Sequence, residues 1–393
     1  MANYNVLIVH NYYRLSGGES SVVKNEKQML EKNGNMVFLY TRDNKEIDSF
    51  TLLQKFLLPL NYLFNLKTYR DIQRIIKEKN IDIVHVHNTI NIISPAVYYA
   101  AFKMKRPVVQ TIHNFRLLCP NGLFYREGNI CEDCVEKGLN EAVKHNCYRD
   151  SRFQTMLSVL GMKIQRGLKL YSRLNYICLT EFNRNKLLML KQIDPKRVYI
   201  KPNYAANESD GILLKKDRKK QFVFASRLDE YKGIKFLFEA WRKVNKDIDL
   251  IVFGDGLLRK WCEDYIAENS IPNIKMMGNV DNTAVKETMK KSYGTIVASK
   301  LYEGFPMSIV ESLSYGTPVA APDLGNSGVL IKDGINGYKY VPGSIEGFLG
   351  TINNIIENES LIKSTRTDYL NKYTEEINCK TLIRIYENCL DTM

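Results

Sequence analysis

The sequence predicts an α/β protein built from two doubly wound parallel sheets. The first observation is its length, because 393 residues exceed one ordinary hydrophobic core and suit two domains of similar size. The second is that runs rich in Val and Ile alternate with helical patterns in two successive series, which is typical of parallel strands buried on both faces. The third is a polar linker, residues 202–220, between the two series.

The first series fills the first half of the chain. Its predicted strands cover 5–10, 36–41, 82–87, 108–113, 176–179 and 198–201, and its predicted helices cover 20–33 and 95–103. We therefore expect an N-terminal Rossmann-like domain over 1–201, with a cysteine-rich insertion at about 115–150.

The second series predicts a C-terminal Rossmann-like domain over 221–375. Its predicted strands cover 222–226, 250–253, 274–277, 295–298 and 319–321, and its predicted helices cover 234–244, 258–268, 284–291 and 308–315. A last helical pattern covers 379–390. Open α/β sheets bind ligands beyond the carboxyl ends of their strands, so we expect the site in a central cleft that both domains face.

Charge is unevenly distributed along the chain. Residues 1–200 hold 30 Lys and Arg against 17 Asp and Glu, whereas residues 201–393 hold 26 of each, so the net charge of +13 comes from the first half. A basic domain suits an anionic membrane or a phosphorylated substrate. Nucleic acid is disfavoured because no helix-turn-helix, zinc-finger or aromatic stacking motif accompanies the charge.

Two acids with seven residues between them, Glu303 and Glu311, flank a predicted loop-to-helix junction. Gly304 and Pro306 interrupt the chain just before the helical pattern that begins at Ser308, so unpaired backbone N–H groups there can face a phosphate. Carboxylates accept hydrogen bonds from the diols of ribose and hexose. The spacing therefore predicts a sugar-nucleotide site, the alternative being a surface helix with two solvated acids.

Two cations follow the first strand of the second series. Arg227 and Lys232 lie five residues apart where that strand ends, and a departing diphosphate needs its developing charge neutralised by fixed cations or a metal. A solvated loop with two surface cations is the alternative. Gly254-Asp255-Gly256, after the next strand, is a tight turn.

The first domain offers a glycine pair and a histidine. Gly17 and Gly18 precede a helix, where backbone can approach a phosphate or sugar closely, but the G-x-G-x-x-G dinucleotide motif is absent. His113 closes a buried strand, where it can donate to a sugar hydroxyl or serve as a structural residue. For His85 and His87 the structural interpretation is favoured, with an acceptor-binding role for His87 as the alternative.

Together these motifs resemble family four of the retaining glycosyltransferases with the GT-B fold, over nearly the whole chain except the cysteine insertion. The resemblance implies acceptor binding by the N-terminal domain, nucleotide-sugar binding by the C-terminal domain, and a C-terminal helix, 376–393, that packs back on the first domain. It implies these catalytic residues: His113, Arg227, Lys232 and Glu303. It implies these donor-binding residues: Gly17, Gly18, Arg227, Lys232, Gly304, Phe305, Pro306, Met307, Ser308 and Glu311.

The implied reaction needs no metal and no enzyme nucleophile. Arg227 and Lys232 assist departure of the diphosphate, and the acceptor hydroxyl attacks the same face and loses its proton to the departing phosphate. Glu303 orients the donor sugar, His113 contacts it, and Glu311 binds the ribose. We expect a hexosyltransferase acting on a glycan or polyprenyl-linked acceptor in cell-surface polysaccharide synthesis.

Two other functions remain open. A GT-B epimerase or hydrolase of sugar nucleotides would turn over without an acceptor. A catalytically silent, sugar-nucleotide-binding partner subunit is disfavoured because Arg227, Lys232, Glu303 and Glu311 are all present.

Two segments, 50–66 and 152–173, mix apolar residues with Lys and Arg and resemble interfacial helices. Core packing is the alternative fate of such patterns. The sequence has no apolar run long enough for a membrane-spanning helix, and its first residues lead into a predicted strand rather than a signal peptide. We therefore expect a cytoplasmic protein that is peripheral on the inner face of the plasma membrane.

Four cysteines, Cys119, Cys131, Cys134 and Cys147, follow a C-x11-C-x2-C-x12-C spacing in the insertion, and His145 can replace one of them. In a reducing cytoplasm thiolates ligate zinc more readily than they form disulfides, and four protein ligands leave no open position for catalysis. The spacing therefore predicts a structural zinc, with unligated thiols as the alternative.

We predict that the purified protein carries about one zinc per chain, held by these four cysteines. Elemental analysis of protein prepared without chelators measures the metal. Metal-free protein with all four thiols freely titratable would contradict the prediction.

Overall fold

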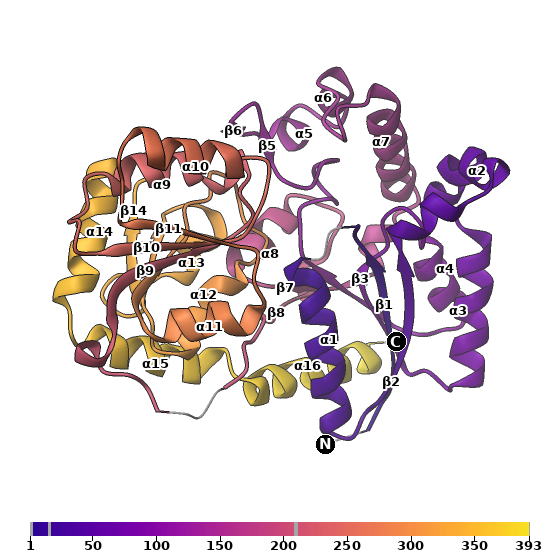
Figure 1. The fold of residues 1–393 in the computed structure, drawn as a ribbon. Coiled ribbons are helices and arrows are strands. Elements are labelled where there is room, and N and C mark those ends of the chain that lie inside the picture. Colours follow the sequence, from indigo (N-terminus) through magenta and orange to yellow (C-terminus); the bar gives the residue numbers. More distant parts are fainter. Residues whose placement is uncertain (1–2, 15–16, 208–210, 393) are drawn as a thin grey trace. The chain divides into compact units, whose positions relative to one another are not determined.

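The computed structural model describes residues 3–14, 17–207 and 211–392, in two compact units. The first unit comprises the chain up to Gly122, Asp133–Pro202, and the chain from Asn378 onward; the second comprises Leu123–Glu132 and Asn203–Ile377 (Figure 1). Met1 and Ala2 before the first strand, Leu15 and Ser16 of the glycine loop, and residues 208–210 of the linker lie outside the described residues.

The insertion at 115–150 is divided between the units, whereas the sequence suggested that it belongs to the first domain alone. The short hairpin of β5 (Tyr125–Arg126) and β6 (Asn129–Ile130) belongs to the second unit. There the ring of Phe124 lies 6.4 Å from that of Tyr302, whose hydroxyl donates to Glu132 Oε1 at 3.0 Å. These contacts are with residues far ahead in the chain, which local patterns cannot reveal.

The first unit contains a six-stranded parallel sheet with the order β2-β1-β3-β4-β7-β8. Its strands are β1 (Asn5–Tyr12), β2 (Met36–Asp43), β3 (Ile83–Asn88), β4 (Val108–Ile112), β7 (Asn175–Cys178) and β8 (Val198–Ile200). Strands β3, β4 and β7 are buried throughout, as their near-continuous Val and Ile runs predicted. The order reverses between β1 and β3.

Helices connect these strands. They are α1 (Gly18–Lys32), α2 (Leu52–Leu63), α3 (Leu66–Glu78), α4 (Ala96–Lys103), α5 (Asp133–Glu136), α6 (Asn140–Lys144), α7 (Arg152–Gly167), α8 (Glu181–Leu188) and α16 (Glu375–Asp391). Short 3-10 turns lie at Asn44–Ser49, Leu170–Ser172 and Pro195–Arg197. From Asn378 onward α16 belongs to this unit, and its Tyr386 hydroxyl lies 2.7 Å from His85 Nδ1.

The second unit repeats the architecture with the order β11-β10-β9-β12-β13-β14. Its strands are β9 (Lys219–Ala225), β10 (Asp249–Phe253), β11 (Ile274–Gly278), β12 (Ser292–Ile296), β13 (Val319–Pro322) and β14 (Gly337–Tyr340). Its helices are α9 (Ile234–Trp241), α10 (Arg259–Glu268), α11 (Asn282–Lys290), α12 (Met307–Ser314), α13 (Gly325–Leu330), α14 (Ile345–Glu357) and α15 (Leu361–Lys372), with 3-10 turns at Lys215–Asp217 and Glu230–Lys232. Strand β9 begins inside the predicted linker.

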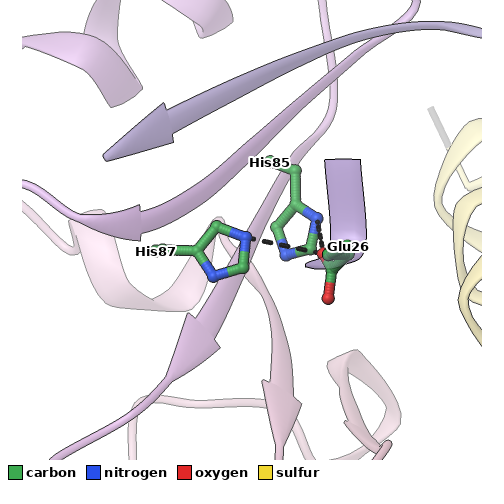
Figure 2. Close-up of side chains that lie close together, drawn as sticks. All are labelled: Glu26, His85 and His87. Atoms are coloured by element: carbon green, nitrogen blue, oxygen red, sulfur yellow. Dashed lines mark ion pairs between the residues drawn. The ribbon is translucent and has the colours of Figure 1, made fainter. Parts of the chain in front are cut away.

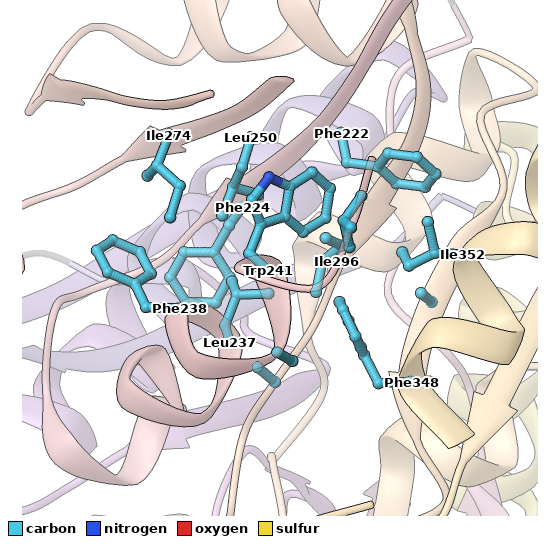
Figure 3. Packing of buried hydrophobic residues seen from close by; sticks show 14 of the residues in the cluster. Phe222, Phe224, Leu237, Phe238, Trp241, Leu250, Ile274, Ile296, Phe348 and Ile352 are labelled. Atoms are coloured by element: carbon cyan, nitrogen blue, oxygen red, sulfur yellow. The ribbon is translucent and has the colours of Figure 1, made fainter. Parts of the chain in front are cut away.

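Buried aromatic and aliphatic residues form the core on one face of the second sheet (Figure 3). Trp241 of α9 is fully buried, with Phe222 of β9 at 5.8 Å and Phe348 of α14 at 6.4 Å between ring centroids. Such packing holds α9 and α14 on the strands. It fixes the positions at which the loops after β9 and β12 leave the sheet.

Among the described residues, no helix is long and apolar enough to cross a membrane.

Candidate active site

The site in the second unit lies where the strand order reverses, between β9 and β12. Parallel strands on either side of such a reversal send their following loops in opposite directions, which opens a crevice at their carboxyl ends. The loop after β9 carries Arg227 and Lys232, and the loop after β12 carries Ser299 and Glu303. The structure thus brings together three of the four residues predicted to be catalytic.

An ion pair joins the two loops. Lys232 Nζ donates to Glu303 Oε1 at 2.6 Å, and both side chains are largely buried. Ser299 Oγ donates to the same carboxylate oxygen. The amide of Asn326, at the start of α13, donates to the carbonyl oxygens of Glu303 and Gly304, at 2.6 Å each, so both the backbone and the side chain of Glu303 are fixed.

This environment keeps Glu303 ionised. Burial alone would raise the pKa of its carboxyl, but the charge and hydrogen bond of Lys232, the Ser299 hydroxyl and nearby Arg227 together hold the pKa below its usual value. Glu303 is therefore an anion that accepts hydrogen bonds, as its proposed sugar hydroxyl requires.

Arg227 is the more accessible cation, with 54% of its side chain exposed. Its Nη2 lies 3.0 Å from Asp229 Oδ2 and also donates to the Tyr231 hydroxyl. Tyr231 in turn donates to Asp229 Oδ2 at 2.7 Å. This small network orients the guanidinium while leaving it exposed to a ligand.

Three glycines allow the loops of this site to pack closely. Gly233 has a φ of +76°, and a Cβ there would lie 1.8 Å from the carbonyl oxygen of Ala298, so a side chain would push Lys232 away from the loop after β12. In the Gly254-Asp255-Gly256 turn, a Cβ at Gly254 would lie 1.9 Å from Ser226 O, and one at Gly256 would lie 2.7 Å from Leu228 O. The turn is therefore a close support for the loop that carries Arg227.

Helix α12 follows Glu303, as predicted. It begins at Met307 after Pro306, and among the described residues no side chain caps its first turn. Phe305 anchors this junction by packing against a buried cluster that includes Ile309 and Val310. The N–H groups of Met307 and Ser308 are therefore held at the positive end of the helix.

Glu311 lies on the same helix, about one turn further on. Asn282 Nδ2 donates to its Oε1 at 3.2 Å, and Lys286 Nζ lies 4.0 Å away. Burial raises the pKa of Glu311, and these two neighbours oppose the rise. Asn282 and Lys286, both on α11, carry no motif and were not predicted.

A second cluster of titratable groups is buried in the first unit (Figure 2). Glu26 of α1 points toward β3, where its Oε1 lies 3.0 Å from His85 Nδ1 and 3.5 Å from His87 Nε2. Lys201 Nζ lies 3.1 Å from Glu26 Oε2 and donates to Asn378 Oδ1 at 2.9 Å. Burial opposes ionisation of Glu26, but Lys201 and His85 hold its pKa well below the usual value.

Glu26, His85 and His87 offer ligand atoms within 4.8 Å of one another, which is compatible with a metal ion. Their present partners argue against one. Lys201 already supplies the positive charge that Glu26 requires, and His85 Nε2 and Nδ1 are hydrogen-bonded to Thr111 and Tyr386, at 2.7 Å each. The cluster is therefore a structural network, as favoured for His85.

His113 extends this network. Its Nε2 lies 2.9 Å from His87 Nδ1, and burial together with the neighbouring His87 holds its pKa well below the usual value, so it is neutral near pH 7. The rings of His87 and His113 also stack, with centroids 5.2 Å apart. His113 is therefore held by His87 on one side, and its position at the carboxyl end of β4 suits contact with a sugar hydroxyl.

A cavity of about 120 Å³ lies beside these histidines within the first unit. Its lining includes His87, His113 and Arg116 from the ends of the strands, and Tyr62, Met162 and Gln165 from α2 and α7. The Arg116 guanidinium lies 5.4 Å from the centre of the Tyr148 ring. The cavity thus combines an apolar wall with a cation and a hydrogen-bond acceptor.

The glycine pair lies at the start of α1 in the same unit. Gly17 is the N-cap, and among the described residues no side chain caps this end of the helix. Glu19 follows at 3.6 Å from His10 Nδ1. Burial raises the pKa of Glu19 to about 8, against the influence of Arg116, and burial lowers the pKa of His10 to about 3. Burial thus favours the neutral form of both groups, a polar pair that sequence analysis missed.

The four cysteines divide between the units. Cys119, Cys134 and Cys147 belong to the first unit and Cys131 to the second. A hydrogen bond with Cys119, followed by burial and the influence of Cys147, raises the pKa of the Cys134 thiol. The zinc prediction itself stays a prediction.

These two sites and sheets define a glycosyltransferase. The chain belongs to the group 1 and family 4 glycosyltransferases: residues 16–204 match the sequence model of Glycosyltransferase Family 4, and residues 206–375 match that of Glycosyl transferases group 1. The fold is GT-B, as the sequence motifs indicated.

Relatives with known or assigned activity are transferases. A lipopolysaccharide 1,6-galactosyltransferase of Salmonella typhimurium is 28% identical over 177 residues, which make up 44% of this chain and 46% of the relative. The GtfA subunit of a UDP-N-acetylglucosamine–peptide N-acetylglucosaminyltransferase of Limosilactobacillus reuteri is 32% identical over 127 residues, 31% of this chain and 24% of the relative. This chain spans about half or less of the length of these curated relatives.

Solved structures share the whole fold. A glycosyltransferase from Rickettsia africae aligns over 100% of both chains with a TM-score of 0.70 and 18% identity. The lipopolysaccharide outer core galactosyltransferase WaaB in its apo form aligns over 98% of this chain and 99% of its own, with a TM-score of 0.65 and 16% identity. Anabaena Alr3699/HepE in complex with UDP and glucose aligns over 99% of both chains, with a TM-score of 0.66 and 16% identity.

Lys201 offers a direct test of the network behind His113. Lys201→Met leaves Glu26 buried without its cation, so we expect the first unit to lose roughly 3–5 kcal/mol of stability. Hydrogen exchange of β3 amides should report the loss. Tryptophan fluorescence should change little, because both tryptophans, Trp241 and Trp261, belong to the second unit.

The exposed Lys196 gives a matched control, and Lys196→Met should leave β3 protection unchanged. Glu26→Gln combined with Lys201→Met should recover part of the loss, since the uncompensated charge is gone. Equal protection in Lys201→Met and the parent protein would contradict the role assigned to the pair.

Proposed function

We propose that this chain transfers a hexose from a nucleoside-diphosphate sugar to a glycan or polyprenyl-linked acceptor in cell-surface polysaccharide synthesis, with retention of anomeric configuration. The observation that carries the proposal is the Lys232–Glu303 ion pair at the order reversal of the second sheet, just ahead of the α12 N-terminus. The similarity to a lipopolysaccharide galactosyltransferase favours a glycan acceptor.

Each group then has a chemical role. Charge that develops on the diphosphate as it departs is stabilised by Arg227 and Lys232, with the N–H groups of Met307 and Ser308 assisting. The acceptor hydroxyl attacks the face the diphosphate leaves and passes its proton to the departing phosphate oxygen. Fixed cations in these positions take the place of a catalytic metal.

The carboxylates bind sugars. Glu303, ionised and held by Ser299 and Asn326, accepts from hydroxyls of the donor hexose, while Glu311 accepts from the ribose diol. We assign His113 Nδ1 to a sugar hydroxyl and the cavity beside Arg116 to the acceptor. The Anabaena structure holds UDP, so UDP is the first nucleotide to test by thermal shift.

Loss of either cation should slow the chemical step. Lys232→Ala or Arg227→Ala should lower turnover by roughly 10²–10³, the scale for one preorganised electrostatic contact to a transition state. Lys235→Ala is a matched control, because Lys235 lies three residues further on and pairs with the exposed Glu230 at 2.8 Å. Activity should persist in EDTA as long as the fold is intact, and NMR of the product should show retention. Parental rates in the cation variants, or an inverted product, would contradict the mechanism.

Substitutions of the two carboxylates should have different effects on turnover and on nucleotide binding. Glu303→Gln should lower turnover while the affinity for free nucleoside diphosphate stays unchanged, because its partner is the sugar. Glu311→Gln should weaken nucleotide binding, since a ribose contact serves the ground and transition states alike. Calorimetric titration with UDP separates the two, with the exposed Glu287→Gln as control. Weakened UDP binding in Glu303→Gln and unchanged binding in Glu311→Gln would reverse the assignment.

A further inference from the structure

Helix α7 turns its apolar residues outward. Phe153, Met156, Leu160, Ile164 and Leu168 follow one another at helical spacing, and all are exposed, Phe153 by 59% and Leu168, which caps the helix, by 62%. A helix on a globular domain ordinarily buries this stripe. Here the stripe faces away from the protein.

The inward face of α7 combines two apolar residues, Val159 and Met162, which belong to a buried hydrophobic cluster, with buried polar side chains that have hydrogen-bond partners. The hydroxyl of Thr155 donates to Ser151 O at 2.7 Å, and Gln165 Oε1 accepts from the Tyr99 hydroxyl at 2.7 Å, with both side chains buried. Rotating α7 to bury the apolar stripe would leave these polar groups without hydrogen-bond partners. Each unpaired group would lower the stability of the fold. The outward direction of the stripe is therefore fixed by the fold.

Helix α2 continues the same surface. Among the described residues it has no buried residue, and Leu52, Phe56 and Leu60, at helical spacing, are exposed by 88%, 79% and 63%. It packs on α7 through Leu63 and Tyr62, beside Gly161, where a Cβ would lie 3.3 Å from Leu63. We call the exposed apolar residues of these two helices the α2–α7 face.

Positive charge predominates around this face, where Asp71 pairs with Lys67 at 2.5 Å. No Asp or Glu occurs from Phe50 to Arg70 or from Ser151 to Thr180. Exposed cations interleave with the apolar residues, and they are Lys55, Lys67, Arg70, Arg152, Lys163, Lys169 and Arg173. An apolar stripe bordered by cations complements a bilayer, in which acyl chains lie beneath anionic head groups.

We propose that the α2–α7 face docks on an anionic lipid bilayer. The apolar side chains enter the boundary between head groups and acyl chains, and the surrounding Lys and Arg pair with lipid phosphates. Two copies of this face would instead set an excess of cations against one another, which disfavours self-association. The cavity lined by Tyr62, Met162 and Arg116 lies directly behind the face, so docking would present it to a lipid-linked acceptor.

Flotation of the full chain with vesicles tests the proposal. Vesicles of phosphatidylcholine with phosphatidylglycerol should bind the protein, and vesicles of phosphatidylcholine alone should bind much less of it. Raising the salt concentration should release the protein, because the Debye length falls from ~10 Å at 0.1 M to ~3 Å at 1 M. Binding that ignores lipid charge and salt, or no binding at all, would overturn it.

Substitutions locate the contact. Phe56→Glu and Phe153→Glu should each lower the partition coefficient roughly ten- to hundredfold, since each removes a buried aromatic side chain and adds a repelled charge. Lys163→Gln should lower it roughly fivefold. Leu257→Glu and Lys260→Gln, at exposed positions of the second unit, are matched controls and should bind as the parent does.

Other occupants give distinct results. Sedimentation without lipid that reveals a dimer abolished by Phe56→Glu would identify a second copy as the occupant and overturn the proposal. Circular dichroism and UDP binding of every variant establish that the fold is retained. A failure of vesicle binding with normal sugar transfer to a soluble acceptor would leave the proposed function intact and refute the docking face alone.

Discussion

The order reversal in each parallel sheet is the constraint on which the rest of the structure depends. Two neighbouring strands there lead into loops that diverge, and polar residues can occupy the space only at that point. In the second unit the reversal separates β9 from β12, and the Lys232–Glu303 pair spans it. In the first unit the reversal lies between β1 and β3, and His10 and His87 lie near the carboxyl ends of these strands. Polar and titratable residues of both units therefore cluster where the strand order reverses.

Much of the fold was predictable from the sequence because buried parallel strands have a recognisable local pattern of apolar residues. Strands such as β3 and β10 are apolar runs of the right length, and the helices between them have matching periods. Elements that lack such a local apolar pattern were not predicted. Helix α15 presents buried Thr365 and Asp368 among its apolar residues, and β14, with the sequence Gly-Tyr-Lys-Tyr, has too few apolar residues to stand out. Tertiary contacts, rather than local pattern, define both.

The candidate site was predictable to the extent that it is local. Glu303, Glu311, Arg227 and Lys232 occupy fixed spacings, so their motifs are readable, but Ser299 and Asn326 hold Glu303 without any motif of their own. The buried network around Glu26 could not be predicted from local sequence patterns. Glu26 lies 175 residues from its partner Lys201, and within α1 it looks like any solvated helical acid. Only the fold reveals that the charge is paired and buried.

The resting ion pair of Lys232 also bears on how the site can work. Contact with Glu303 orients the Lys232 ammonium before any ligand arrives. In the proposed reaction, little reorganisation would therefore be needed when charge develops on the leaving diphosphate. Ser299 and Asn326 hold Glu303 from the other side, so the carboxylate remains in place if Lys232 turns partly toward phosphate. In the proposed reaction, charges paired in advance in this way would stabilise the departing diphosphate without a metal.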